Sequence, residues 1–355
     1  MSDNIFDRLA ELLSSPGNVN WAIAGEIGSS VAGEPGTVDA GAVAHWEGLV
    51  ETASRMLGVA TAVDLTPPPV VALDRRDWTT QTIPGFRYLA EPLAATLSAD
   101  QSNPFAPMFS IMIGLQVGSM VGSMSHRALG NFDSALPPLE SPNLRFVAPN
   151  VGEFTESHDL DPAQAHLWVA AHELVQHRLI SRPDVTGRFR SLVDTYLSGL
   201  EINQDAMPFD GVEAGLDPDR LGQMMQDPSF LTGMFTGPHQ AEDLARIQAF
   251  LAVIEGYVGY LLNGLESNLM PQLDRIREAV DRRRATPSQG EVFLQKMLGI
   301  ELRRPEYRTG TEFFEEVERR WGREATATVW AGADTLPHPE ELADPVAWAA
   351  RTLLS

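Results

Sequence analysis

The most clearly bounded element of the sequence is a helix predicted over residues 162–180. It begins with a capping carboxylate, Asp161, followed by Pro162 at the first helical position, which is typical of a helix start. Arg182-Pro183 marks the end, because the residue before a proline is disfavoured in a helix. The apolar residues cluster on one side of this helix: Leu167, Ala170, Ala171, Leu174 and Val175. We therefore expect this helix to be at least partly buried.

Helical periodicity also dominates the rest of the chain, and strand-like runs are few and short. Helices are predicted at residues 19–30, 40–57 and 241–265, with a charged, solvent-facing helix at 274–284. The best strand candidates are residues 70–73 and 144–147, which contain β-branched or aromatic residues and lie close to prolines. The two strands could belong to one small sheet. The expected fold class is mainly α with a small β-sheet (α+β).

The length of 355 residues allows one large domain or two modest ones, and a hydrophobic content of 43% is sufficient for a packed core. The triple proline at residues 67–69 ends an N-terminal unit. We expect an N-terminal helical segment at 1–66 and a larger domain at 67–355, together forming one compact unit.

Charge and cysteine content exclude several classes of function. The net charge of −22 argues against general affinity for nucleic acid or for anionic membranes. The chain has no cysteine, so disulfides, thiolate metal sites and cysteine nucleophiles are excluded. Any metal ion must bind through nitrogen and oxygen. No P-loop or dinucleotide-binding motif occurs either.

Two segments bear on location. Residues 1–8 do not have the pattern of a secretory signal, which predicts a cytoplasmic protein. Residues 101–125 carry no charged side chain and have Gly114, Gly118 and Gly122 at four-residue spacing, as in some membrane helices. Prolines and polar residues dilute the apolar content of this segment. We therefore expect a buried helix with a face of small residues and no membrane span.

The predicted helix at 162–180 carries the sequence HELVQH at residues 172–177. In a zinc-binding H-E-x-x-H helix, two imidazoles at i and i+4 share one face, and the intervening glutamate, here Glu173, is the general base. In this chain Gln176 occupies the i+4 position, and the second imidazole comes one residue later. Gln176 lies roughly 40° around the helix from His172, and His177 roughly 140°. An undistorted helix therefore cannot bring both imidazoles to one metal ion.

Glu255 is an acid within an otherwise apolar helical stretch at residues 249–257. Burial of a lone carboxylate is costly unless it is paired or bound to a cation, which makes Glu255 the candidate third metal ligand. The alternative is a salt bridge to a core arginine. For Glu173, the alternative is an ordinary acid on the helix surface. The arginines at 282–284 are interpreted as the basic C-terminal end of a helix, where cations interact favourably with the helix dipole.

These segments also carry a family resemblance. Residues 167–173 (LWVAAHE) and 251–257 (LAVIEGY) resemble two elements of the bacterial zincin-like metallopeptidase family that is associated with deazaflavin-cofactor biosynthesis. Further similar segments are 128–133, 147–150, 298–313 and 336–348, so the resemblance extends from residue 19 to residue 351. It implies a zincin-like helical metallopeptidase fold for the larger domain.

The resemblance implies zinc ligands at His172, residue 176 and Glu255, with Glu173 as the base. Gln176 departs from the family pattern, which has a histidine there. Three outcomes stay open. A π-bulge could turn His177 towards the metal, the amide oxygen of Gln176 could bind zinc as a weaker ligand, or the site could hold no metal.

Three functions follow from these outcomes. The first is a metallohydrolase-family protein whose altered site is impaired or inactive as a peptidase. The second is an active zinc-dependent hydrolase that uses His172, Glu255 and either Gln176 or His177, with Glu173 taking a proton from zinc-bound water. The third is a helical binding or scaffold protein. Zinc is thus a possible cofactor whose presence the sequence leaves open, as it does the substrate, the protein partner and the oligomeric state.

Overall fold

The computed structural model describes residues 17–97, 106–134, 136–202, 235–236, 239–265, 270–298 and 306–354. This part of the chain is mainly helical with a small parallel sheet, which confirms the predicted fold class. The segment at residues 1–8, whose lack of a signal pattern predicts a cytoplasmic location, lies outside the described residues, as do residues 101–105, 203–226 and 299–300.

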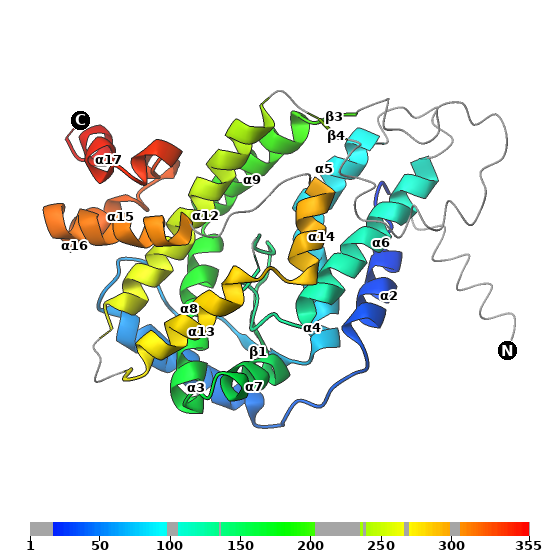
Figure 1. Ribbon diagram of the computed structural model, residues 1–355, viewed down its shortest axis with the longest axis horizontal. Coiled ribbons are helices and arrows are strands. Elements are labelled where there is room, and N and C mark those ends of the chain that lie inside the picture. The colour runs from blue at the N-terminus through cyan, green and yellow to red at the C-terminus, as the bar shows by residue number, and fades with distance from the viewer. Residues whose placement is uncertain are drawn as a thin grey trace, which may run out of the picture.

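The helices run in chain order as α2 (Trp21–Ala32), α3 (Ala42–Gly58), α4 (Arg75–Thr82), α5 (Arg87–Leu97), α6 (Ala106–Ser125), α7 (Ala148–Ser157), α8 (Pro162–Ile180), α9 (Pro183–Ser198), α12 (Gln240–Asn263), α13 (Leu273–Ala285), α14 (Gln289–Leu298), α15 (Glu306–Trp321), α16 (Arg323–Thr328) and α17 (Pro345–Thr352). In Figure 1, α2, α4, α5, α6 and α14 lie at one side of the molecule and α15 to α17 at the other, with α8, α12 and α13 between them.

The predicted strands are both present, as β1 (Val70–Leu73) and β2 (Leu144–Val147). They pair in parallel, with Val70 opposite Leu144 and Leu73 opposite Val147. Gly130 forms a single antiparallel bridge with Phe146 of β2. This bridge fixes the segment around residue 130 beside the sheet. A second pair, β3 (Glu201–Ile202) and β4 (Phe235–Thr236), is antiparallel.

The glycines of α6 form the contact with α2. A Cβ atom at Gly114 would lie 2.3 Å from the carbonyl oxygen of Asn20, and one at Gly118 would lie 2.4 Å from that of Ala24. A larger residue at either position would therefore push the two helices apart. The described part of the predicted small-residue face, including Gly122, thus lies at a helix contact inside the protein.

Two helical stretches, Met108–Ser125 and Gln240–Asn263, are long and apolar enough to span a membrane. Their apolar windows are 72% and 67% buried within the fold, as is usual for core helices. The length and composition of these helices are therefore accounted for by packing inside the protein.

Helix α8 begins and ends at the predicted residues. The carboxylate of Asp161 caps its N-terminus by accepting a hydrogen bond of 3.0 Å from the amide of Gln164. The helix is α-helical from Pro162 to Ile180 without a π-bulge. It is buried around most of its circumference because α3, α9, α12 and α13 all pack against it. The side chains of the HELVQH sequence therefore have protein neighbours on several sides.

Candidate functional site

His172 and Glu255 come together although they are far apart in the sequence. His172 lies on α8 and Glu255 lies on α12, and His172 Nε2 is 3.4 Å from Glu255 Oε2. Their side chains are only 5% and 10% exposed. The ring of Trp168, one turn earlier on α8, stacks on the His172 imidazole with centroids 5.1 Å apart. The imidazole is thus held in place from one side by the indole and from another by the carboxylate.

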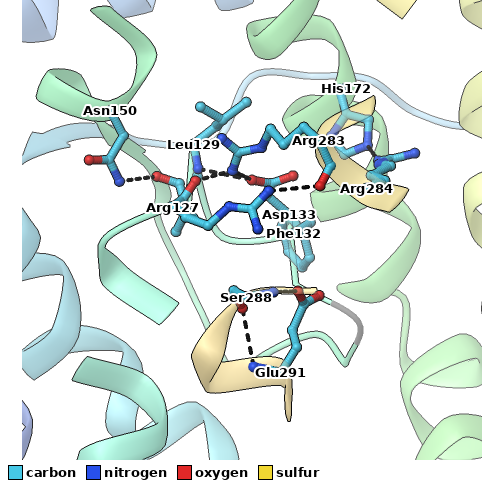
Figure 2. Close-up of polar contacts among 12 residues, drawn as sticks. Arg127, Leu129, Phe132, Asp133, Asn150, His172, Arg283, Arg284, Ser288 and Glu291 are labelled. Carbon is cyan, nitrogen blue, oxygen red and sulfur yellow. Dashed lines mark hydrogen bonds and ion pairs between the residues drawn. The ribbon is translucent and has the colours of Figure 1, made fainter. Parts of the chain in front are cut away.

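A cation from α13 completes this pair. Arg284 Nη2 is 2.9 Å from His172 Nε2 and 3.2 Å from Glu255 Oε2. Figure 2 shows the Arg284 side chain facing His172. Burial lowers the pKa of Arg284, but the charge of Glu255 raises it, and the net shift is upward. Glu255 therefore forms a salt bridge to a core arginine, the alternative that the sequence left open for this acid.

The protonation of His172 depends on this cluster. Burial lowers the pKa of His172, whereas the Glu255 charge and hydrogen bonds with Glu173 and Glu255 raise it, to about 9. The contact with Arg284 is a hydrogen bond only when Nε2 is unprotonated and can accept. A protonated imidazole would instead donate from Nε2 to Glu255. In both states the carboxylate of Glu255 has a cationic partner.

Glu173, the candidate base, has a different environment. Its Oε2 accepts hydrogen bonds from the backbone amides of Asn131 (2.7 Å) and Phe132 (3.0 Å). Its Oε1 is 3.5 Å from Nδ1 of His172. Burial raises the pKa of Glu173, and His172 and the Phe132 amide oppose that shift. The side chain is 1% exposed, so this carboxylate is a buried acceptor that holds the segment containing Gly130 against α8.

The structure does not bring His177 to His172 and Glu255. His177 Nε2 is 3.0 Å from the carbonyl oxygen of Ser141, and its ring packs edge-on against Phe132 with centroids 6.1 Å apart. Burial lowers the pKa of His177. His177 lines a separate hollow of about 900 Å³ on another side of α8. Gln176 is buried one helical turn after His172. The proposed π-bulge is therefore not formed.

A second network joins α13 to residues 131–133, the segment whose amides bind Glu173. Arg283 donates to the Asp133 carboxylate and to the carbonyl oxygen of Arg127. In return, Arg127 Nη2 donates to the carbonyl oxygen of Arg283 at 2.7 Å. Figure 2 shows these neighbouring arginines reaching different partners, Arg283 towards Asp133 and Arg284 towards His172. The C-terminal end of α13 is thus fixed on both sides.

These contacts correct the interpretation of the arginine run as a purely solvent-facing helix end. Arg282 is exposed and pairs with Glu278 on its own helix, but Arg283 and Arg284 are mostly buried. The sequence carried a signal for this. Ile276 and Val280 are buried on α13, and residues 283 and 284 continue the same face at spacings of three and four.

The cluster of His172, Glu255 and Arg284 opens onto a cleft of about 410 Å³ between α8, α12, α13 and α15. Trp168 and Tyr307 contribute aromatic walls to the cleft. A cleft of this size is within the range of small-molecule sites. Among the described residues of α8, the wall includes Trp168 and His172, whereas Glu173, Gln176 and His177 do not line it.

A catalytic zinc ion usually has three protein ligands and one open position. In the described part of the chain, no three histidine or acidic side chains are grouped so that they could hold a metal ion. His172 and Glu255 supply two candidate donors, and the guanidinium of Arg284 contacts both. A guanidinium is always a donor and cannot bind a metal ion. The side chains present therefore do not fit a zinc centre.

Comparisons with known proteins agree with this fold. The profile of the family described as zincin-like metallopeptidase matches residues 19–349. The crystal structure of a "putative hydrolase with a novel fold" from Chloroflexus aurantiacus is similar, with a TM-score of 0.70 and 21% sequence identity over 95% of this chain and 99% of that chain. At this identity the similarity concerns the fold alone. A search of curated proteins found no match.

Proposed function

The chain belongs to the zincin-like metallopeptidase family, and on this premise we propose that it is a member that no longer hydrolyses peptide bonds with zinc. Such hydrolysis needs a metal ion with three protein ligands and a general base that can reach the metal-bound water. The cleft beside His172 is the part of the ancestral site that remains accessible, and binding is the function that it can still serve.

The environment of Glu173 is the observation that carries this proposal. A general base must reach the proton that it removes, directly or through one water molecule. The Glu173 carboxylate accepts hydrogen bonds from the amides of Asn131 and Phe132. Glu173 is not one of the described residues that line the cleft. This acid therefore has a structural role in place of the catalytic one.

The test combines metal analysis with peptide hydrolysis. We expect the purified protein to contain zinc far below one ion per chain by elemental mass spectrometry. We also expect no chelator-sensitive cleavage of a mixture of fluorescence-quenched peptides, with or without added zinc. Glu173→Gln is the matched control, because its amide oxygen can still accept from Asn131 and Phe132. Chelator-sensitive cleavage that is lost in this folded variant would contradict the proposal.

A residual zinc-dependent hydrolase is the second candidate, and one observation favours it. His172 Nε2 and Glu255 Oε2 lie 3.4 Å apart at the wall of the cleft, where two metal ligands would be needed. This candidate requires a third ligand from Gln176 and a displaced Arg284. It predicts stoichiometric zinc that disappears in His172→Ala, which the same metal analysis would detect.

A further inference from the structure

The distance between His172 and Glu255 is suited to a metal ion. Two ligands at zinc–nitrogen and zinc–oxygen distances near 2.1 Å, at a tetrahedral angle, would be about 3.4 Å apart. His172 Nε2 and Glu255 Oε2 are separated by 3.4 Å. His172 and Glu255 are thus as far apart as two ligands of one zinc ion would be, although the group that contacts both is the Arg284 guanidinium.

Arg284 is firmly held in this position. Its neighbour Arg283 is tied to Asp133 and to the Arg127 carbonyl, which fixes the end of α13. The guanidinium carbon lies 5.6 Å from the centre of the Tyr307 ring, so an aromatic face supports the cation. Arg284 Nε is buried without a hydrogen-bond partner among the described residues. The guanidinium is therefore held mainly by its salt bridge with Glu255, and it lies 2.9 Å from His172 Nε2.

A metal ion and Arg284 would exclude each other. Both would occupy the place beside the same oxygen of Glu255 and the same nitrogen of His172, because Arg284 Nη2 is within 3.2 Å of each. A divalent cation bound there would lie close to a like charge in a poorly solvated place, where Coulomb repulsion is strong. The residue at position 176 is a separate obstacle to zinc binding. Gln176 offers a neutral amide oxygen where the family has an imidazole, and an amide is a weaker ligand for zinc.

We infer that Arg284 is a built-in cation in the place of the metal ion, and that it blocks a latent zinc site formed by His172, Glu255 and residue 176. This inference rests on the proposed function, because it explains how a member of this family keeps two metal donors without binding metal. It predicts that restoring the second histidine is not sufficient. Zinc binding returns only when the imidazole at 176 is restored and Arg284 is removed together.

The experiment compares the wild type, Gln176→His, Arg284→Ala and the double variant. Zinc affinity is measured by competition with a chromophoric chelator, and the geometry of the site by the visible absorption of bound Co²⁺. We expect the double variant to bind one zinc ion at least about 100-fold more tightly than either single variant. It should also show the intense bands of tetrahedral cobalt, whereas the single variants should not.

Arg282 provides the matched control. It is exposed on the same helix and pairs with Glu278, so Arg282→Ala combined with Gln176→His removes the same charge outside the site. This combination should bind zinc no better than Gln176→His alone. If Arg284→Ala lowers the folded fraction, as seen by circular dichroism, Arg284→Met, which keeps a long unbranched side chain without the charge, replaces it in the comparison.

Two results would overturn the inference: Gln176→His binding zinc as tightly as the double variant, or the double variant binding no more tightly than the single ones. The wild-type measurement separates this failure from that of the proposed function. Stoichiometric zinc in the wild type would refute the proposed function, whereas a metal-free wild type with no gain in the double variant would refute only the role of Arg284.

Discussion

The carboxylate of Glu173 should stabilise the fold, and we expect Glu173→Ala to lower the free energy of unfolding by about 4 kcal/mol. The substitution removes the acceptor of two backbone amides, those of Asn131 and Phe132, at 2.7 and 3.0 Å. Both residues are buried, at 1% and 3% exposure, so water cannot replace the carboxylate without rearrangement. The segment that they hold also forms the bridge from Gly130 to β2.

The magnitude follows from the two unpaired donors. Each buried amide that loses its partner costs about 1–3 kcal/mol, which gives about 2–6 kcal/mol for the pair. Removing a buried charge offsets part of this cost, and the void left by the side chain adds to it. Glu173→Gln should lose less than half as much as Glu173→Ala, because one amide oxygen can still accept from both donors.

Urea denaturation followed by circular dichroism measures the difference. Glu156→Ala is the control, because Glu156 is an exposed acid on α7 and its replacement should change stability by less than about 0.5 kcal/mol. A Glu173→Ala protein within about 1 kcal/mol of the wild type would refute the reasoning. That result would mean that the carboxylate is not needed as a structural acceptor and is free for another role.

Two further predictions concern neighbouring and distant contacts. Gly130→Ala should destabilise the protein by about 2 kcal/mol, because the new Cβ would lie 2.4 Å from Cδ of Glu173. Gly48→Ala, in an open position on α3, should stabilise it by about 0.5 kcal/mol or more; equal effects in thermal unfolding would contradict this contrast. Burial raises the pKa of Glu341. Its hydrogen bonds with Arg351 and with the backbone of His338 lower the pKa, and together with the charge of Arg351 they outweigh burial, so the net shift is downward. The stabilisation from Glu341 should therefore be complete above its unfolded-state pKa and be lost as the pH falls through the lower folded value. The stability difference between wild type and Arg351→Met should shrink over that acidic interval, and a pH-independent difference would show that the ion pair contributes nothing.

Local signals made much of the fold predictable. The bounds of α8, β1 and β2 were predicted correctly because capping residues and prolines mark them in the sequence. Helices α4, α5 and α7 were not predicted. Helix α5 contains Pro92 in its interior, a residue that normally ends a helix, and α7 follows β2 without an intervening turn. Helix α4 has a local start signal that was overlooked, because the Asp74 side chain caps it by accepting from the amide of Asp77. Helix α5 is stabilised by packing against α6 and α9.

The site was predictable only in part. The sequence singled out His172 and Glu255, and the structure brings them together. The role of Arg284 depends on how α13 lies against α8 and α12, which no local pattern determines. The hydrogen bonds that Glu173 accepts come from backbone amides. Almost every residue has such an amide, so the residue types in the sequence do not indicate these bonds. Candidate metal donors are therefore easier to recognise in a sequence than the groups that neutralise them.

The identity of the cation between His172 and Glu255 decides whether the zinc site is blocked or able to bind metal. Crystals of the wild-type protein grown with excess zinc, with diffraction measured on both sides of the zinc absorption edge, would answer this. We predict no anomalous peak between the two side chains, with Arg284 Nη2 within hydrogen-bonding distance of both. A strong peak bonded to His172 Nε2 and Glu255, with Arg284 displaced, would show that this chain binds zinc and that Arg284 does not block the site.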